Sequence, residues 1–144
     1  MRQSGIDNYT PLAQLLVVKP EWQTVAETPQ YLRDSASVGL TEQAARDLGI
    51  DVEIVEYDLG ALAATSIQRK DYRGRAQLVI DHDGDILVGA TFVGPEVAEL
   101  VHAATIAIVA QVSLELLRHA VPSYPTVSEI WLRLLESRDP STES

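Results

Sequence analysis

The side-chain types that most often carry chemistry are few in this sequence and widely spaced. Its three histidines, His82, His102 and His119, include no pair at the i, i+4 spacing that places two metal ligands on one helix. Aspartate recurs three times between residues 81 and 85, where a solvated turn is favoured over a metal loop. The chain has no cysteine, which excludes thiolate nucleophiles, redox pairs and thiolate metal sites. The sequence therefore predicts no metal site.

Loops that hold phosphates or dinucleotides are missing as well. Neither GxGxxG nor GxxxxGK[ST] occurs, and the spacing of Gly89 and Gly94 fits neither pattern. Such loops use glycine because the backbone must approach the phosphates closely. We therefore expect this chain to contain no binding site for flavin or nicotinamide cofactors.

One short stretch places a titratable group behind a rigid approach. In VPSYPTVSE, residues 121–129, prolines precede and follow a Ser-Tyr pair, and a glutamate ends the stretch before an apolar run. Tyr124 and Glu129 each have a structural interpretation as well as a functional one. Tyr124 fits an interface aromatic whose hydroxyl finds a hydrogen-bond partner. Glu129 fits a charge in the first turn of a helix, where the helix dipole stabilises it.

Strands must position these residues, and the apolar pattern predicts four of them, at residues 36–40, 51–59, 75–81 and 85–93. The last two are expected to form a hairpin. The Asp-Gly dipeptide between them supplies the positive φ angles that a two-residue type I′ turn requires. Residues 60–68 are small and apolar, and a loop or a helical turn is expected there.

The predicted helices cover residues 42–48, 96–112 and 114–119, with a last helix that ends near residue 137. Thr41 and Ser113 are the expected N-caps of the first and third helices, and Thr126 or Ser128 that of the last. Pro95 stands where the first residue of the long second helix belongs.

The second helix is unusually apolar. Seven of its positions carry aliphatic or alanine side chains that leave little room for a solvated face: Val97, Leu100, Val101, Ala104, Ile106, Ala107 and Ile108. Such a helix is expected to be buried on nearly all sides. In a domain of 144 residues this is unusual unless a second subunit covers one side, and the alternative is a monomer in which residues 1–34 fold over that surface.

The order of elements gives a fold class and a domain division. A strand, a helix, a strand, a hairpin and three helices predict an α+β fold in which an antiparallel sheet packs against helices. Residues 1–34 are read as a weakly specified helical extension, residues 35–138 as the domain, and residues 139–144 as a flexible tail.

Charge and hydropathy limit the expected partners. The formal net charge is −10, so phosphate backbones and anionic headgroups are repelled, and neither nucleic acid nor membrane is an expected partner. The longest apolar run, residues 103–112, is shorter than the ~18 residues of a membrane span. The sequence also shows no signal-peptide pattern. We therefore expect a cytoplasmic protein.

Three blocks of the sequence resemble a known family. They are SVGLTE (37–42), LVGATFVGPEVAELVHAATIAI (87–108) and YPTVSEIW (124–131). In order and spacing they look like the carboxy-terminal dimerisation domain of the pyridine nucleotide-disulfide oxidoreductases, which include dihydrolipoyl dehydrogenase, glutathione reductase and mercuric reductase. The resemblance covers roughly residues 36–137 and implies the same α+β fold and a homodimer.

The resemblance also implies an active-site position. The family's last block usually reads H-P-T-x-S-E, in which the histidine enters the partner subunit's active site as acid and base and the glutamate holds its ring. Here Pro125, Thr126, Ser128 and Glu129 match, but Tyr124 stands in the histidine position. A phenol has an ordinary pKa near 10, so it is a poor proton shuttle at neutral pH, although it can donate a hydrogen bond.

Further implications concern the interface and the cofactors. The residues expected in or next to a two-fold interface are Val97, Val101, Ala104, Ile108, Tyr124, Pro125 and Trp131. The parent family uses FAD and NAD(P)H, which bind to domains that precede this region.

Three functions are compatible with the sequence. The first is a dimerisation domain of a flavin-dependent reductase, present without its FAD and NAD(P)H domains and not catalytic alone. The second is the C-terminal part of a working oxidoreductase whose other domains lie on another chain or upstream in the gene. The third is a stand-alone dimer that binds a small molecule.

Overall fold

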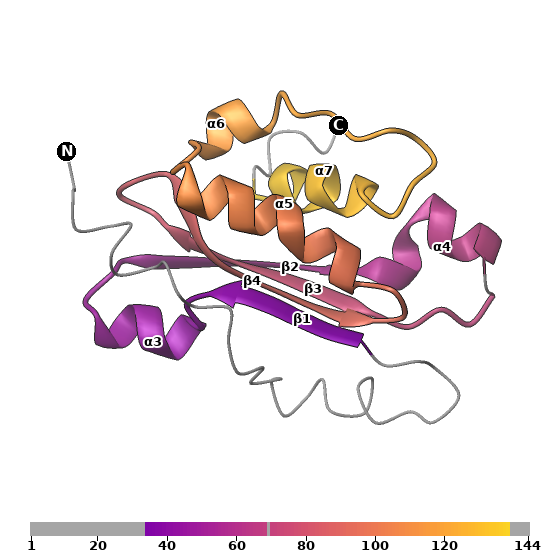
Figure 1. Ribbon diagram of the computed structural model, residues 1–144, viewed down its shortest axis with the longest axis horizontal. Helices are drawn as coiled ribbons and strands as arrows, with labels where there is room; N and C mark the ends of the chain where they lie inside the picture. The colour runs from indigo at the N-terminus through magenta and orange to yellow at the C-terminus, as the bar shows by residue number, and fades with distance from the viewer. Residues whose placement is uncertain (1–33, 69, 139–144) are drawn as a thin grey trace.

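The computed structural model describes residues 34–68 and 70–138 (Figure 1). The extension predicted at residues 1–34 lies outside the described residues except for Asp34, which begins a strand. The tail predicted at residues 139–144 also lies outside them.

One antiparallel sheet forms the centre of the described fold. Its strands are β1 (Asp34–Gly39), β2 (Val52–Asp58), β3 (Arg75–Asp81) and β4 (Ile86–Gly94). They lie in the order β1-β4-β3-β2, so the β3–β4 hairpin occupies the middle of the sheet. The four predicted strands are all present, with ends that differ by no more than two residues. Together with the helices below, the sheet confirms the α+β class.

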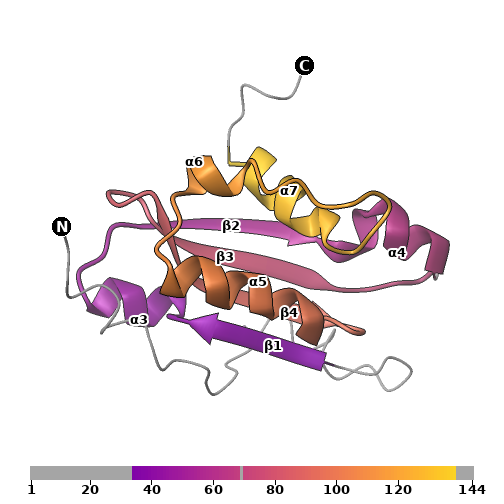
Figure 2. The same cartoon turned by 45° about the horizontal axis from the view of Figure 1, so that its top comes forward.

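The helical segments are α3 (Glu42–Asp47), η2 (Leu59–Ala61), α4 (Ala63–Gln68), α5 (Ala98–Val109), α6 (Leu114–Leu117) and α7 (Glu129–Glu136). Helix α5 packs on β1 and β4, whereas α7 packs on β2 and β3. Both helices therefore cover the same face of the sheet, and a long loop leads from α6 to the start of α7 (Figures 1 and 2). The segment after β2 is helical, which was one of its two predicted states.

The core lies between this face of the sheet and the two helices. The Phe92 ring of β4 is fully buried and lies 5.6 Å from the Trp131 ring of α7, in a tilted arrangement. Leu78 of β3 and Leu134 of α7 are also fully buried. Burial of such side chains stabilises the fold by about 1.5–3 kcal/mol each, and it fixes α7 against the sheet.

The end of β1 depends on two glycines. Gly39 has a φ of +77°, a conformation that side chains with a Cβ adopt rarely. A Cβ atom on the paired Gly89 would lie 1.9 Å from the Leu40 carbonyl oxygen. The chain can therefore turn closely over β4 into α3 only because both positions are glycine.

The hairpin is confirmed, but its predicted turn is wrong. Asp81 pairs with Ile86, so four residues rather than two form the loop. The positive φ angle lies at Asp85, where it is 49°, and not at the Asp-Gly dipeptide. The Asp81 carboxylate accepts a hydrogen bond from the Gly84 amide at 3.2 Å, which satisfies a backbone donor of this longer loop.

Helix α5 starts later and ends earlier than predicted. Glu96 has a φ of 60°, so the chain is not helical there, and Pro95 is not the first helical residue. The Pro95 carbonyl instead accepts a hydrogen bond from the Tyr72 hydroxyl at 2.8 Å. After Ala110, Gln111 has a φ of 48° and ends the helix.

The predicted helix caps are confirmed at two of three positions. The Thr41 hydroxyl accepts a hydrogen bond from the Ala44 amide at 3.1 Å, and the Ser113 hydroxyl accepts one from the Leu116 amide at 3.2 Å. Ser128 occupies the N-cap of α7 but makes no side-chain cap bond, because its backbone is helical rather than extended. The Thr126 hydroxyl donates to the Ser123 carbonyl instead.

Candidate functional site

The loop between α6 and α7 presents Tyr124 to solvent. Its side chain is 73% exposed, and its hydroxyl has no hydrogen-bond partner among the described residues. Beyond it, backbone turns lead directly into the helix, because the Thr126 carbonyl accepts a hydrogen bond from the Glu129 amide at 3.1 Å. The structure therefore holds an aromatic side chain outward on a loop that is fixed at both ends by helices.

Glu129 opens α7 and is almost completely buried. Its Oε1 accepts two hydrogen bonds from Arg133, at 2.8 Å from Nη2 and 3.1 Å from Nε. Its Oε2 is buried without a hydrogen-bond partner in the described part of the chain. The hydrogen bond to Glu129 raises the pKa of the Arg133 guanidinium. Burial lowers this pKa, and the nearby Glu136 raises it further. The Arg133 guanidinium therefore stays charged near neutral pH.

The structure pairs Glu129 with Arg133 and not with Tyr124. No hydrogen bond joins Tyr124 and Glu129, although the sequence pattern places them at family-equivalent positions. The analysis of the sequence missed Arg133. Its signal was the four-residue spacing of a glutamate and an arginine, which places both side chains on the same side of a helix.

The residues expected at the interface are divided by the structure into two groups. Val97 and Ala104 are fully buried in the core of the single chain, and Ile108 and Trp131 are almost so. Val101 is half-buried, whereas Tyr124 and Pro125 are exposed. Four of the seven positions thus contact the chain's own sheet and helices.

A different set of apolar side chains faces outward. Five are large: Ile106 and Val109 of α5, Leu116 of α6, and Val121 and Tyr124 of the following loop, each at least half exposed. The smaller Ala103 of α5 is also exposed. We call these six residues the outer apolar face. Sequence periodicity could not distinguish the two sides of α5, because both are apolar.

A cavity adjoins the outer apolar face. It has a volume of about 230 Å³ and lies between α5, α6, the loop and α7. Its lining is mostly apolar and includes Ala103, Leu117, Pro122 and Trp131, with Glu99 as its charged residue. Ala103 therefore belongs both to the outer apolar face and to the wall of the cavity.

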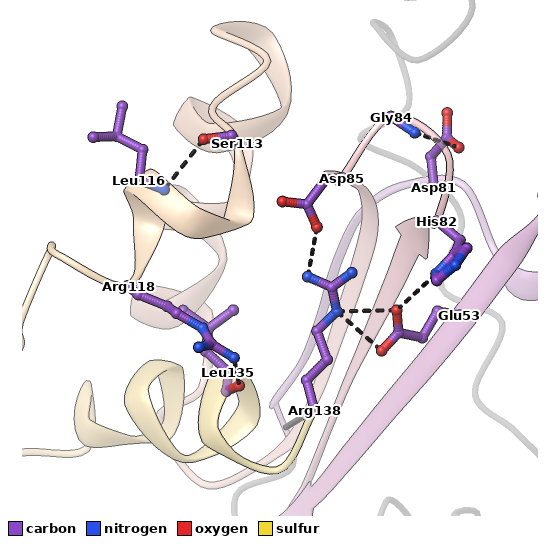
Figure 3. Close-up of polar contacts among 10 residues, drawn as sticks. All are labelled: Glu53, Asp81, His82, Gly84, Asp85, Ser113, Leu116, Arg118, Leu135 and Arg138. Carbon is purple, nitrogen blue, oxygen red and sulfur yellow. Dashed lines mark hydrogen bonds and ion pairs between the residues drawn. The ribbon is translucent and has the colours of Figure 1, made fainter. Parts of the chain in front are cut away.

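The far end of α7 is attached to the sheet by ion pairs (Figure 3). Arg138 Nε lies 3.0 and 2.9 Å from the two carboxylate oxygens of Glu53 in β2, and its Nη1 donates to Asp85 in the hairpin loop. His82 Nδ1 lies 3.5 Å from Glu53 Oε2. Burial disfavours the Arg138 charge, but the hydrogen bonds with Asp85 and Glu53 outweigh this and raise the pKa of the guanidinium.

Comparison with known proteins identifies the family. A family model described as the dimerisation domain of the pyridine nucleotide-disulphide oxidoreductases matches residues 33–134. The chain belongs to this family. The match contains the outer apolar face, Tyr124 and Glu129, and it confirms the resemblance seen in the three sequence blocks.

Individual curated proteins are similar in sequence to this dimerisation domain. The chain is 35% identical over 94 residues to a dihydrolipoyl dehydrogenase of Rhizobium etli, which covers 65% of this chain and 19% of that protein. It is 31% identical over 104 residues to a glutathione reductase of Burkholderia cepacia, which covers 72% and 23%. The chain thus spans about a fifth of the length of the curated relatives that it matches.

Solved structures share the fold of the dimerisation domain. The HOCl-induced flavoprotein disulfide reductase RclA from Escherichia coli superposes with a TM-score of 0.65 at 22% identity, over 74% of this chain and 26% of that chain. An NAD-dependent persulfide reductase from A. fulgidus gives a TM-score of 0.62 at 21% identity, over 74% and 20%.

Two further observations concern the described part of the dimerisation domain. Residues 34–68 and 70–138 contain no group of three His, Asp or Glu side chains that could hold a metal ion. Over the same ranges, no helix is long and apolar enough to cross a membrane.

Arg138→Ala is expected to destabilise the dimerisation domain by about 2 kcal/mol, because it leaves two carboxylates without their cationic donor. Arg138 is only 18% exposed, so water replaces its bonds poorly. The raised pKa belongs to a cation, so this stabilisation is fully present below the ordinary arginine pKa and is lost only in strong alkali. Urea unfolding measures the effect.

Arg46→Ala is the matched control. Arg46 pairs with Glu42 on the surface of α3 and is 50% exposed. Its removal is expected to cost about 0.5 kcal/mol or less. Equal losses for the two variants would contradict a specific attachment of α7 through Arg138.

Proposed function

We propose that this domain joins two copies of a flavin-dependent pyridine nucleotide-disulfide oxidoreductase in a two-fold symmetric homodimer. The observation that supports this most is the outer apolar face. It holds five of the seven large apolar side chains that are exposed among the described residues, and the other two are Leu48 and Ile67. A concentration of exposed apolar side chains on neighbouring elements is typical of an interaction site.

Charge favours a second copy as the partner for this face. Each copy carries a formal net charge of −10, so two copies repel each other over most of their surface. Residues 103–109 of α5 contain no charged side chain. A contact along α5 therefore brings together the surface where this repulsion is weakest.

The catalytic work belongs to other domains in this proposal. FAD and NAD(P)H would bind to flavin and nucleotide domains, either on the same polypeptide or on another chain, and the 144 residues alone would bind neither. Tyr124, exposed on its loop, would approach the partner protomer as a hydrogen-bond donor. The family's proton transfer from a histidine at this position would not take place here.

The mass of the purified chain tests the proposal. Light scattering coupled to gel filtration is expected to give twice the chain mass of 15.8 kDa at micromolar concentration. An obligate two-fold interface of this kind buries ~2,000 Å² or more, which is enough for a stable dimer. A mass of a single chain at that concentration would refute the dimer.

A further inference from the structure

We propose that residues 69–75, which join α4 to β3, form a docking surface for a segment of a partner protein that is rich in Asp and Glu. We call residues 69–75 the basic segment. Its described part, residues 70–75, lies beside α4, at the opposite end of the sheet from α6 (Figures 1 and 2). The segment contains no residue of the outer apolar face, so this proposal is independent of the dimer.

The formal charge of the chain is strongly uneven at the basic segment. Its sequence, RKDYRGR, holds four of the 11 lysine and arginine residues of the chain within seven positions. With one aspartate it carries a formal charge of +3, so the rest of the chain carries −13. A positive surface on an otherwise acidic protein attracts acidic partners to one place and repels them elsewhere.

The cations of the basic segment have no partner in the described part of the chain. Lys70, Arg73 and Arg75 are exposed, and their side chains form no hydrogen bond or ion pair there. The other described cations are bonded, namely Arg46, Arg133 and Arg138 to carboxylates and Arg118 to the Leu135 carbonyl. Unpaired like charges along one short segment repel each other, and an anionic partner would relieve this repulsion.

Two carboxylates lie near the basic segment, but neither forms an ion pair with these cations. Asp71 belongs to the segment and is already engaged in an interaction of its own. Asp58 of β2 is the register partner of Arg75. Its Oδ1 instead accepts a hydrogen bond from the Gly60 amide at 2.8 Å. The three cations therefore remain available to an external carboxylate.

The backbone of the basic segment is fixed, and it presents the arginines outward. Tyr72 and Gly74 are buried and alternate with the exposed Arg73 and Arg75. The Tyr72 hydroxyl donates a hydrogen bond to the Pro95 carbonyl at 2.8 Å. A Cβ atom at Gly74 would lie 2.9 Å from a carbonyl oxygen of β4, so glycine permits this close packing. A fixed backbone lowers the entropy that is lost when a partner binds.

The surroundings of the basic segment favour a protein over a small phosphate ligand. Guanidinium groups bind carboxylates and phosphates alike through paired hydrogen bonds. Small ligands usually bind in concave sites, and phosphates at the N-terminus of a helix. The basic segment follows the C-terminal end of α4 and does not line the cavity between α5 and α7. An acidic segment of a protein can contact all three exposed cations at once.

Fluorescence anisotropy of a labelled poly-glutamate peptide, measured on the full chain at low ionic strength, tests this proposal. The peptide should bind, and added salt should weaken the complex because exposed ion pairs are screened. Arg73→Gln should weaken binding roughly threefold. The triple variant Lys70→Gln/Arg73→Gln/Arg75→Gln should weaken it roughly thirtyfold, as expected for the loss of three exposed ion pairs. Far-UV circular dichroism checks that the variants are folded.

Arg46→Gln is the matched control, because it removes the same charge from an exposed arginine of α3 outside the basic segment. It should leave the affinity for the peptide nearly unchanged. Arg73→Lys keeps the positive charge and should retain most of the binding. Equal losses for Arg46→Gln and Arg73→Gln would assign the effect to net charge and overturn the proposal.

The remaining outcomes are equally decisive. No binding of the peptide, or binding that the triple variant leaves intact, would overturn the docking surface. If inorganic pyrophosphate displaced the labelled peptide at lower concentration than the unlabelled peptide does, the segment would be a phosphate site and the proposal would be wrong. The dimer is tested separately, because all of these variants should keep the mass of the unmodified chain in light scattering.

Discussion

Ile106→Glu is expected to convert the dimer into a folded monomer. Ile106 is 55% exposed in the single chain, so a carboxylate at this position stays hydrated when the chain is alone. In the proposed dimer the outer apolar face is covered, so a carboxylate at this position would lose its water. An unpaired buried charge costs about 3 kcal/mol, which is roughly a hundredfold in the dissociation constant. Light scattering should show the mass of one chain.

Ile67→Glu separates this effect from a general response to added charge. Ile67 is more exposed than Ile106 and lies on α4, away from the outer apolar face. This variant should keep the mass and the circular dichroism of the unmodified chain. If both variants dissociated equally, added negative charge would explain the result and α5 would not be the contact.

Ala104→Glu is expected to unfold the chain. Ala104 has no exposed surface and faces the sheet, although it is only two residues from Ile106. A carboxylate there loses its hydration and gains no partner, which costs about 4 kcal/mol or more. This is comparable to the whole stability of a small domain. Far-UV circular dichroism and urea unfolding should show a shift of the midpoint far below that of the unmodified chain.

Ala103→Glu is the matched control for Ala104→Glu, because the two residues are neighbours in α5 and only Ala104 is buried. Ala103 is exposed, so this variant should fold normally and lose only the dimer. A folded Ala104→Glu chain with a normal urea midpoint would contradict the packing of that side of α5 against β1 and β4.

Local chemistry was readable from the sequence. Thr41 and Ser113 cap their helices as predicted, because a hydroxyl at an N-cap acts on an amide only three residues away. The four strands follow the apolar pattern for the same local reason, and the three sequence blocks were sufficient to recognise the family. Tyr124 and Glu129 were correctly located in the loop and at the start of α7.

Features that depend on residues far apart in the sequence could not be predicted from it. The hairpin has a four-residue loop because a register irregularity between Val79 and Ile80 changes how β3 and β4 end. The ion pair of Arg138 joins residues 85 positions apart in the sequence. No local pattern of spacing or propensity contains either feature.

The sequence by itself determined the fold class, the family and the need for an apolar α5 to be covered on more than one side. Only the tertiary structure decided which side is which. Both sides of α5 are apolar, so hydrophobic periodicity has no preferred direction. The packing of Ala104 and Ile108 against the sheet removes that ambiguity, and it leaves Ala103, Ile106 and Val109 exposed.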